Sequence, residues 1–164
     1  MNATEGLIRA AIPQDEVVLA AGSCAELTND ELLDAQGHVS SVVVTGSHLH
    51  WASSGGAFHL TSLGLSTVTG VREQAVRHRC LMTLEHAPLE RIHRISAHRV
   101  LMLSWGNAEA IDPFSRTRLR FSRRETEAAV ALRTQLEAQG LTWSIEEDPR
   151  PPDDPEPHYL RRVS

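Results

Sequence analysis

Residues 115–140 constrain the fold most, because they place the clearest strand pattern of the chain directly before its clearest helix pattern. In "SRTRLRFS", a Thr-Leu-Phe face alternates with arginines, which is the two-residue period of a strand with one buried face. In the next segment, apolar residues recur at the spacing of one helical face: Ala128, Ala129, Leu132 and Leu136. We expect Ser122 and Glu125 to form a capping box at the helix start and Gly140 to end the helix.

Residues 42–53, "VVVTGSHLHWAS", predict two strands joined by a turn. Three β-branched residues come first, then "TGS", a turn segment in which Gly46 tolerates a positive φ, and then an alternating segment. Alternate side chains of a strand point to opposite faces. We therefore expect Leu49 and Trp51 to face the core and the two histidines of this segment to face outward.

Other segments extend the chain around this hairpin. A short helix is expected from Thr4 to Ala11, stopped by Pro13. Further strands are expected within residues 16–27, within 57–63, from Leu81 onward and within 98–107. Residues 62–79 have mixed periodicity, and we interpret them as a loop with a short helix.

The length of 164 residues suits one domain with its own core and is short for two. We expect a helical segment over residues 1–13, a mainly β (α+β) domain over 14–140 and an acidic, proline-rich tail over 141–164. Acid and proline at the density of the tail bury too little apolar surface to stay ordered. The expected architecture is an antiparallel barrel or two packed sheets, capped by the C-terminal amphipathic helix.

The sequence favours a cytoplasmic protein. No window approaches the roughly 20 apolar residues of a membrane-spanning helix, and the first residues lack the apolar core of a signal peptide. Cys24 and Cys80 are not spaced as a redox or metal pair, so a reducing compartment suits them. Association with the periphery of a membrane is compatible with these features.

Charge is distributed unevenly along the chain. All 16 basic residues are arginines, against 21 acidic residues, and the formal net charge is −5. Both ends are acidic, whereas residues 72–124 are rich in arginine. Guanidinium groups are planar and suit carboxylates and phosphates. Acidic ends that lie over the basic middle would explain this distribution without any outside partner.

Three segments together carry a family pattern. They are "VVVTGSHLHWAS", "PLERIHRI" at residues 88–95 and the strand-to-helix segment that begins at Arg116. In these segments the chain resembles the pleckstrin-homology-like superfold and, within it, the GRAM-like domains of bacteria. The resemblance covers residues 14–139 and implies a barrel with a C-terminal helix, with an insertion near residues 54–80.

The same resemblance does not imply a phosphoinositide site. Lipid-binding pleckstrin-homology domains usually carry basic residues in the loop between their first two strands. The corresponding loop holds four acidic residues and no arginine: Glu26, Asp30, Glu31 and Asp34.

The strongest candidate site is a ladder of arginines. Arg116, Arg118 and Arg120 are expected on one face of a strand, continued by Arg123 and Arg124 beside the helix start. Such a group suits a phosphate, a nucleic-acid backbone or an acidic peptide. Alternatively, the face is solvated or covered by the acidic tail. Sequence-specific nucleic-acid binding is not expected, because the chain is acidic overall and no aromatic residues interleave with the ladder.

Histidines provide a second candidate site. His48 and His50 would lie on one strand face, and His59 on the next strand, with Cys80 or His86, would complete a metal set. The alternative, which we favour, is a sheet rim with solvated histidines. On that interpretation the chain holds no metal or other cofactor.

Three functional hypotheses remain. The first is a non-catalytic adaptor that recognises a protein segment or an anionic membrane surface through the arginines, with a peptide added to an exposed strand edge. The second is a histidine-based metal-binding or enzymatic barrel, and the third is a self-associating structural subunit. An enzyme is not expected, because the sequence has neither a nucleophile elbow nor a glycine-rich phosphate loop.

Overall fold

The structure is a computed structural model that describes residues 2–27, 36–53, 59–87, 90–93 and 115–147. In this part of the chain the elements are, in order, α1 (Ala3–Ala11), β1 (Val18–Leu27), β2 (His38–Thr45), β3 (His48–Ser53), β4 (His59–Gly64), one turn of 3₁₀-helix (Leu65–Thr67), β5 (Val68–Val76), β6 (Arg79–His86), β7 (Glu90–His93), β8 (Arg116–Phe121), α3 (Glu127–Ala138) and β9 (Ile145–Glu147). The strand expected within 98–107 lies outside the described residues.

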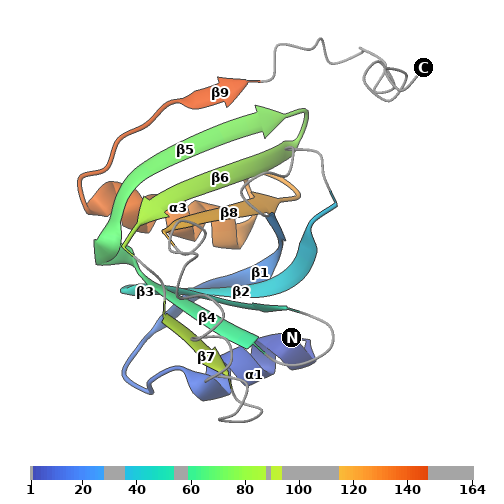
Figure 1. The fold of residues 1–164 in the computed structure, drawn as a ribbon, viewed down its shortest axis with the longest axis vertical. Coiled ribbons are helices and arrows are strands. Elements are labelled where there is room, and N and C mark those ends of the chain that lie inside the picture. Colours follow the sequence, from blue (N-terminus) through green and yellow to red (C-terminus); the bar gives the residue numbers. More distant parts are fainter. Residues whose placement is uncertain (1, 28–35, 54–58, 88–89, 94–114, 148–164) are drawn as a thin grey trace.

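The strands of these ranges form one sheet in the order β7-β4-β3-β2-β1-β8-β6-β5-β9 (Figure 1). Neighbouring strands are antiparallel, except for β5 and β9, which are parallel. The expected mainly β fold with a C-terminal amphipathic helix is confirmed. The end strands β7 and β9 are not paired with each other, so the described sheet is single and open. Neither closure into a barrel nor a division into two packed sheets is observed in it.

The sheet curls around α3, so that strands from both halves contribute to one core on the concave side (Figure 1). α3 buries the expected apolar stripe: Ala128, Ala129, Leu132 and Leu136. Apolar side chains of β2, β3, β6 and β8 face this stripe, among them Met82 and Phe121. Leu49 and Trp51 belong to the same core, which confirms their inward orientation.

α1 covers the opposite, convex face of the sheet at β2, β3 and β4. The helix begins after Asn2, whose Oδ1 accepts a hydrogen bond from the N–H of Glu5 (2.7 Å). Ile8 is buried against Val43 of β2 and Leu60 of β4. Strands β2 and β3 are therefore buried on both faces, which explains the continuous apolar run in β2.

The turn between β2 and β3 is closed by a side chain. The Thr45 hydroxyl accepts hydrogen bonds from the backbone N–H groups of Ser47 (3.3 Å) and His48 (3.0 Å). Gly46 does not adopt the positive φ that its residue type allows. The turn that precedes the two histidines is therefore set by local bonding of a threonine to the backbone.

α3 starts later than expected and ends as expected. Its N-cap is Thr126 and not Ser122, so the expected capping box is absent. The Thr126 hydroxyl caps no helix N–H and instead donates to the carbonyl of Arg123 (3.2 Å) in the turn that precedes the helix. Gly140 has a φ of +91° and follows the helix in a Schellman arrangement of backbone hydrogen bonds. Within the described ranges, no helix combines the length and the apolar character needed to cross a membrane.

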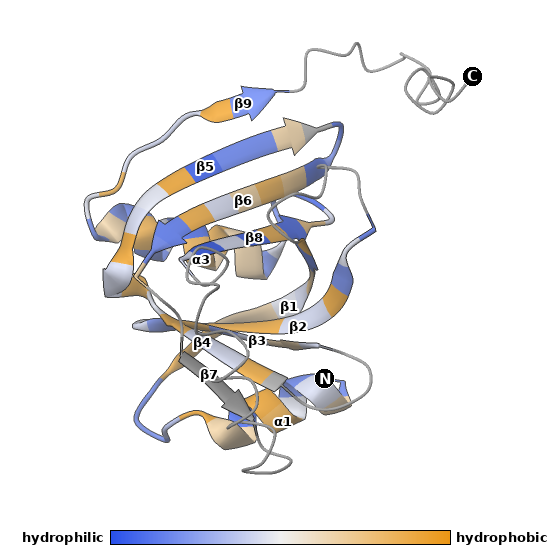
Figure 2. Ribbon diagram, viewed as in Figure 1, coloured by the Kyte–Doolittle hydropathy of each residue, from blue (hydrophilic) through white to orange (hydrophobic). Residues whose placement is uncertain are grey.

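Residues 68–76 form β5, so the interpretation of residues 62–79 as a loop with a short helix is wrong for most of that segment. The inward face of β5 carries Val71, Glu73 and Ala75, as its register with β6 shows. A charge in the middle of an inward face breaks the alternation that identifies a strand. Figure 2 shows the same feature, since the middle of β5 is hydrophilic while β1 to β3 are largely hydrophobic.

The chain stays in the fold beyond residue 140. Residues 145–147 form β9 and pair with Glu73, Gln74 and Ala75 of β5. The predicted tail of residues 141–164 therefore begins no earlier than residue 148, from which point the chain lies outside the described residues.

Replacing Leu132 by alanine should lower the free energy of unfolding by about 2–5 kcal/mol, because the side chain is fully buried between α3 and the sheet. The control is Val130→Ala on the same helix, where the side chain is 43% exposed. This change should alter the stability by less than about 0.5 kcal/mol. Urea unfolding followed by circular dichroism measures both, and equal effects would contradict the packing of α3.

Candidate functional site

The arginine ladder lies on the convex face of the sheet. In β8, Thr117, Leu119 and Phe121 are buried, and the three arginines between them point to the other face: Arg116, Arg118 and Arg120. The expected alternation is therefore present. This face is opposite the core that α3 covers.

The pairing of β5, β6 and β8 arranges this face in rows that cross three strands. The rows are Gly70–Glu85–Arg116, Arg72–Thr83–Arg118 and Gln74–Leu81–Arg120. Adjacent strands lie about 4.8 Å apart, so the backbones at the two ends of a row are about 10 Å apart. The middle row thus holds two arginines on either side of a neutral threonine.

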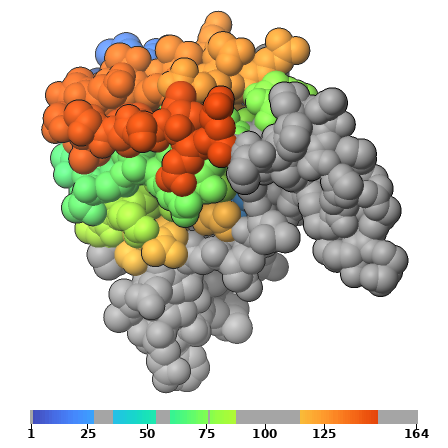
Figure 3. Space-filling view, turned by 90° about the horizontal axis from the view of Figure 1, so that it is seen from above, coloured from blue at the N-terminus to red at the C-terminus, as the bar shows by residue number. Residues whose placement is uncertain are grey.

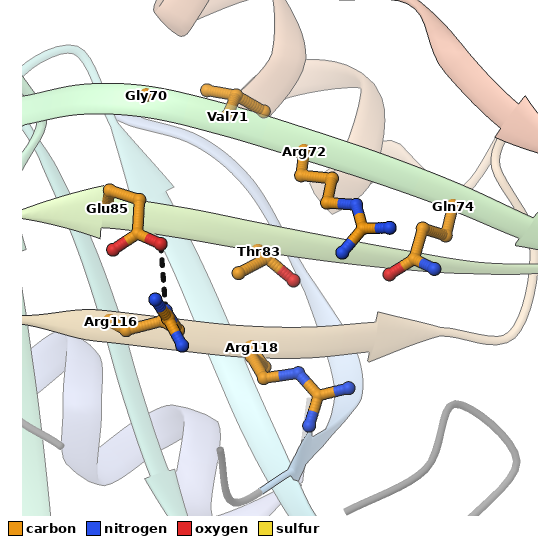
Figure 4. Close-up of a pocket in the computed structure, with 8 residues that line it drawn as sticks. All are labelled: Gly70, Val71, Arg72, Gln74, Thr83, Glu85, Arg116 and Arg118. Carbon is orange, nitrogen blue, oxygen red and sulfur yellow. Dashed lines mark hydrogen bonds and ion pairs between the residues drawn. The ribbon is translucent and has the colours of Figure 1, made fainter. Parts of the chain in front are cut away.

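An open hollow of about 400 Å³ lies over these rows (Figure 4). Its lining consists of Gly70, Val71, Arg72, Gln74, Thr83, Glu85, Arg116 and Arg118. Three arginines and one glutamate give the lining an excess of positive charge. The remaining polar groups are an amide and a hydroxyl, which donate and accept hydrogen bonds without charge. This combination suits an anionic ligand.

The arginines of the ladder already make polar contacts with the protein. Arg116 Nε donates to Glu85 Oε1 at 2.8 Å, and both side chains are about half exposed. Arg120 Nη2 donates to the backbone carbonyl of Gln36 at 3.2 Å. Ion pairs at this exposure contribute about 0–1 kcal/mol, so a carboxylate ligand can compete with them.

Arg72 is a member of this face that the sequence did not reveal. Its guanidinium forms a bidentate pair with Glu146, with distances of 2.8 Å from Nε to Oε2 and 2.9 Å from Nη2 to Oε1. This hydrogen bonding lowers the pKa of the Glu146 carboxyl and raises the pKa of Arg72. Figure 3 shows the end of the described chain lying directly against β5. An acidic segment near the C-terminus thus contacts the basic middle of the chain.

Arg124 does not belong to the ladder, although it follows closely in sequence. Its Nε donates to Glu73 Oε2 at 2.8 Å, on the concave side of the sheet. Arg123 is exposed, and its carbonyl accepts the hydroxyl hydrogen bond of Thr126. The five arginines singled out in the sequence are therefore not brought together as one group. Arg116, Arg118 and Arg120 share a face with Arg72.

Glu73 is a fully buried carboxylate with four partner residues. The donors come from separate parts of the chain: Arg124 Nε (2.8 Å), Arg133 Nη2 (3.0 Å), Trp143 Nε1 (2.9 Å) and Cys80 Sγ (3.2 Å). Burial acts to raise the pKa of Glu73, but the hydrogen bonds from Arg133, Trp143 and Cys80 outweigh it and lower the pKa to about 2. The carboxylate therefore stays charged inside the protein.

The histidines form a different set from the expected one. His48 and His50 lie next to Glu16, with which His50 Nε2 makes a contact of 3.0 Å. His50 is 3% exposed, so it is not the solvated rim residue that we favoured. The cause is the segment between α1 and β1, which brings Glu16 over this face.

The other expected ligands make no such group among the described contacts. His86 Nε2 is hydrogen bonded to Thr117 Oγ1 at 2.8 Å, and Cys80 Sγ donates to Glu73. His59 is in β4, but its side chain lies outside the described residues. Burial raises the pKa of both thiols, Cys24 and Cys80, to about 12, so neither is an activated nucleophile.

Sequence reasoning missed Arg72 and Glu16 for a physical reason. Arg72 meets the ladder only through the register of β5 with β6 and β8, and β5 was not recognised. Glu16 reaches the histidines through the fold of the α1–β1 segment and is 34 residues from His50 in sequence. The excess of acid near both ends was the only signal that pointed to such contacts.

Comparison with known proteins gives no family for this chain. No family model matches it, and no curated protein matches it. Among solved structures, it is similar to the hSac2 domain from human phosphoinositide phosphatase Sac2. The sequence identity is 12% and the TM-score is 0.46, over 94% of this chain and 90% of that chain. At that score the similarity carries no argument about fold or function.

Replacing Glu73 by glutamine should destabilise the protein and change how its stability depends on pH. The pKa of Glu73 is about 2 in the folded protein against an ordinary 4.5, so the carboxylate stabilises the fold above pH 4.5. This contribution, about 3 kcal/mol, is lost as the pH falls from about 4.5 towards 2. The variant should lose it at neutral pH and should lack this part of the pH dependence.

The matched control for this experiment is Glu85→Gln, which removes an exposed pair with Arg116. It should lower the stability by at most about 1 kcal/mol. Urea unfolding at pH 7 and at several values between pH 2 and 5 measures both variants. An unchanged pH profile in Glu73→Gln would show that the buried carboxylate does not stabilise the fold.

Proposed function

We propose that this protein is a non-catalytic binding module that holds an acidic, extended protein segment against the arginine face of β5, β6 and β8. The observation that carries the proposal is the docking of β9. This acidic segment adds to the edge of β5 as a strand and places Glu146 on Arg72 in bidentate contact. The β9 segment of the protein itself thus has the features that we propose for the ligand.

Strand addition supplies affinity through the backbone, and side chains supply specificity. β9 pairs with residues 73–75 of β5 and leaves the preceding part of this edge, residues 68–72, without a strand partner among the described residues. All three residues of β9 are exposed, so little apolar burial holds it in place. A longer acidic segment could extend along β5 or replace β9.

The arginine face supplies the charge preference of this module. Carboxylates of a bound segment would meet Arg72 and Arg118 at the two ends of the middle row and Arg116 in the next row. Planar guanidinium groups bind carboxylates bidentately, as the Arg72–Glu146 pair illustrates. Because these groups are exposed, binding should weaken as the salt concentration rises.

The proposal is consistent with the resemblance to pleckstrin-homology-like and GRAM-like domains. The described residues share with that pattern a curled antiparallel sheet and an amphipathic helix near its end, although the sheet is open and not a closed barrel. A cytoplasmic setting suits the two free, buried thiols.

Replacing both Arg116 and Arg118 by glutamine should weaken the binding of an acidic peptide by about tenfold, which corresponds to about 1.4 kcal/mol. The probe is a fluorescent peptide with the sequence of residues 141–158, "LTWSIEEDPRPPDDPEPH", because it contains the acidic segment that docks on β5. Fluorescence anisotropy at several salt concentrations measures its affinity. Light scattering verifies that the oligomeric state is unchanged.

The control is Arg9→Gln, which removes one positive charge from α1, on a helix that packs against β2 to β4. Its affinity for the peptide should equal that of the unmodified protein. Equal affinity in the double variant would remove the arginine face from the proposed function. Binding to vesicles with anionic lipids, without binding to the peptide, would replace the protein segment by a membrane surface.

Replacing Glu146 by glutamine should strengthen the binding of the same peptide by about two- to fivefold, because Arg72 loses its internal partner. The control is Glu147→Gln, which removes the same charge from the neighbouring position, on the other side of β9. If both variants strengthen binding equally, net charge alone is responsible and β9 is not a competitor.

A further inference from the structure

A compact group of three potential metal ligands lies on the convex face of β3, at its turn with β2. His48 and His50 project from β3 on the same side, and their rings stack with centroids 5.4 Å apart. Glu16 approaches from the segment between α1 and β1. Its Oε1 lies 3.0 Å from His50 Nε2 and 3.6 Å from His48 Nδ1. One ligand atom from each residue lies within 4.8 Å of the others.

We propose that Glu16, His48 and His50 bind a zinc ion or a similar divalent transition metal ion. Zinc bonds to histidine nitrogen and carboxylate oxygen are about 2.0–2.2 Å long, so tetrahedral ligands lie about 3.4 Å apart. The two contacts of Glu16 are on either side of this distance. Two imidazoles and one carboxylate suit zinc and exclude a preference for calcium or magnesium, which favour oxygen ligands.

Hydrogen bonds to His50 and Glu16 favour metal binding, because they orient these two ligands. His48 Nδ1, in contrast, contacts the Ser47 hydroxyl at 2.8 Å, which an ion on that nitrogen would displace. Ser62 of β4 is bonded to His50 Nδ1 at 2.7 Å, which leaves Nε2 directed at Glu16. The Thr45 hydroxyl donates to Glu16 Oε1 at 2.8 Å. Partners of this kind are typical of protein metal sites, where they fix the tautomer and the orientation of the ligands.

The Ser62 hydroxyl can serve His50 with or without a metal ion. Without a metal, His50 Nε2–H donates to Glu16, and Nδ1 accepts from the hydroxyl. With a metal on Nε2, the proton moves to Nδ1, and the hydroxyl becomes the acceptor. Both states keep the hydrogen bond between Ser62 and His50, so binding requires small side-chain shifts and no rearrangement of the fold.

Two of the three ligands, His50 and Glu16, are largely buried, whereas His48 is partly exposed to solvent. The His50 side chain is 4% exposed and is held between the Ser62 hydroxyl and Glu16. Burial acts to raise the pKa of Glu16, but hydrogen bonds from His50 and Thr45 lower it overall. The His48 side chain is 40% exposed, which gives an ion access and leaves a fourth position for water.

The ion would join two separate parts of the fold. Glu16 belongs to the segment that leads from α1 into β1, whereas both histidines belong to β3. A metal that binds the folded protein would therefore hold α1 and its following segment on the convex face. Because such an ion binds the folded state, it should raise the thermal stability of the protein.

The test titrates the untagged full chain with zinc chloride by isothermal calorimetry and with cobalt chloride by visible absorption. We expect one ion per chain and the absorption bands of four-coordinate cobalt. Glu16→Gln and His48→Gln should each weaken zinc binding by at least about 100-fold, since each removes a ligand. Ser62→Ala should weaken it by about 10- to 100-fold and shift the cobalt bands, because it releases the His50 ring.

The control is His78→Gln, which removes an exposed histidine from the turn between β5 and β6. It should bind zinc as the unmodified protein does. His48 is partly exposed, so His48→Gln is expected to fold, and its circular dichroism spectrum verifies this. Absence of a bound ion, or equal affinity in Glu16→Gln and His48→Gln, would overturn the proposal. Variants of the arginine face leave this outcome unaffected, because their residues lie on other strands.

Discussion

The fold depends on one buried carboxylate, Glu73 of β5. A charge inside a protein is tolerated only when its partners replace water, and removal of one partner destabilises a fold by several kcal/mol. Here the partners come from the turn before α3, from α3 itself, from β6 and from the segment after α3. Glu73 therefore ties the helix and the chain that follows it to the sheet. Through Trp143 the same contact brings β9 to the edge of β5, where Glu146 meets Arg72.

The parts of the fold that could be predicted from the sequence are those governed by local patterns. The alternation in β8 and the apolar stripe of α3 each depend on residues close together in the chain, so the buried positions of both elements were predicted. The same holds for Leu49 and Trp51 of β3, which enter the core as expected. The arginine ladder of β8 was predicted because it is the other half of an alternating pattern.

The features that could not be predicted depend on contacts between distant residues. β5 has a charged residue at a core position, and only the fold shows that Arg133 and Trp143 compensate it. Arg124 resembles a continuation of the ladder but turns to Glu73, because a buried charge attracts it more strongly than an exposed face does. The carboxylate beside His50 is that of Glu16, which lies just before β1 and is 34 residues from His50 in sequence.

Residues 143–146 contact side chains on both faces of β5. Arg72 and Glu73 are adjacent and point to opposite sides of the sheet, and they bind Glu146 and Trp143 respectively. The chain from Trp143 to Glu146 thus passes around the edge of β5 and contacts both of its faces. If a residue were inserted or deleted between these two positions, Trp143 and Glu146 could not both reach their partners on β5. These two contacts therefore constrain the number of residues between Trp143 and Glu146.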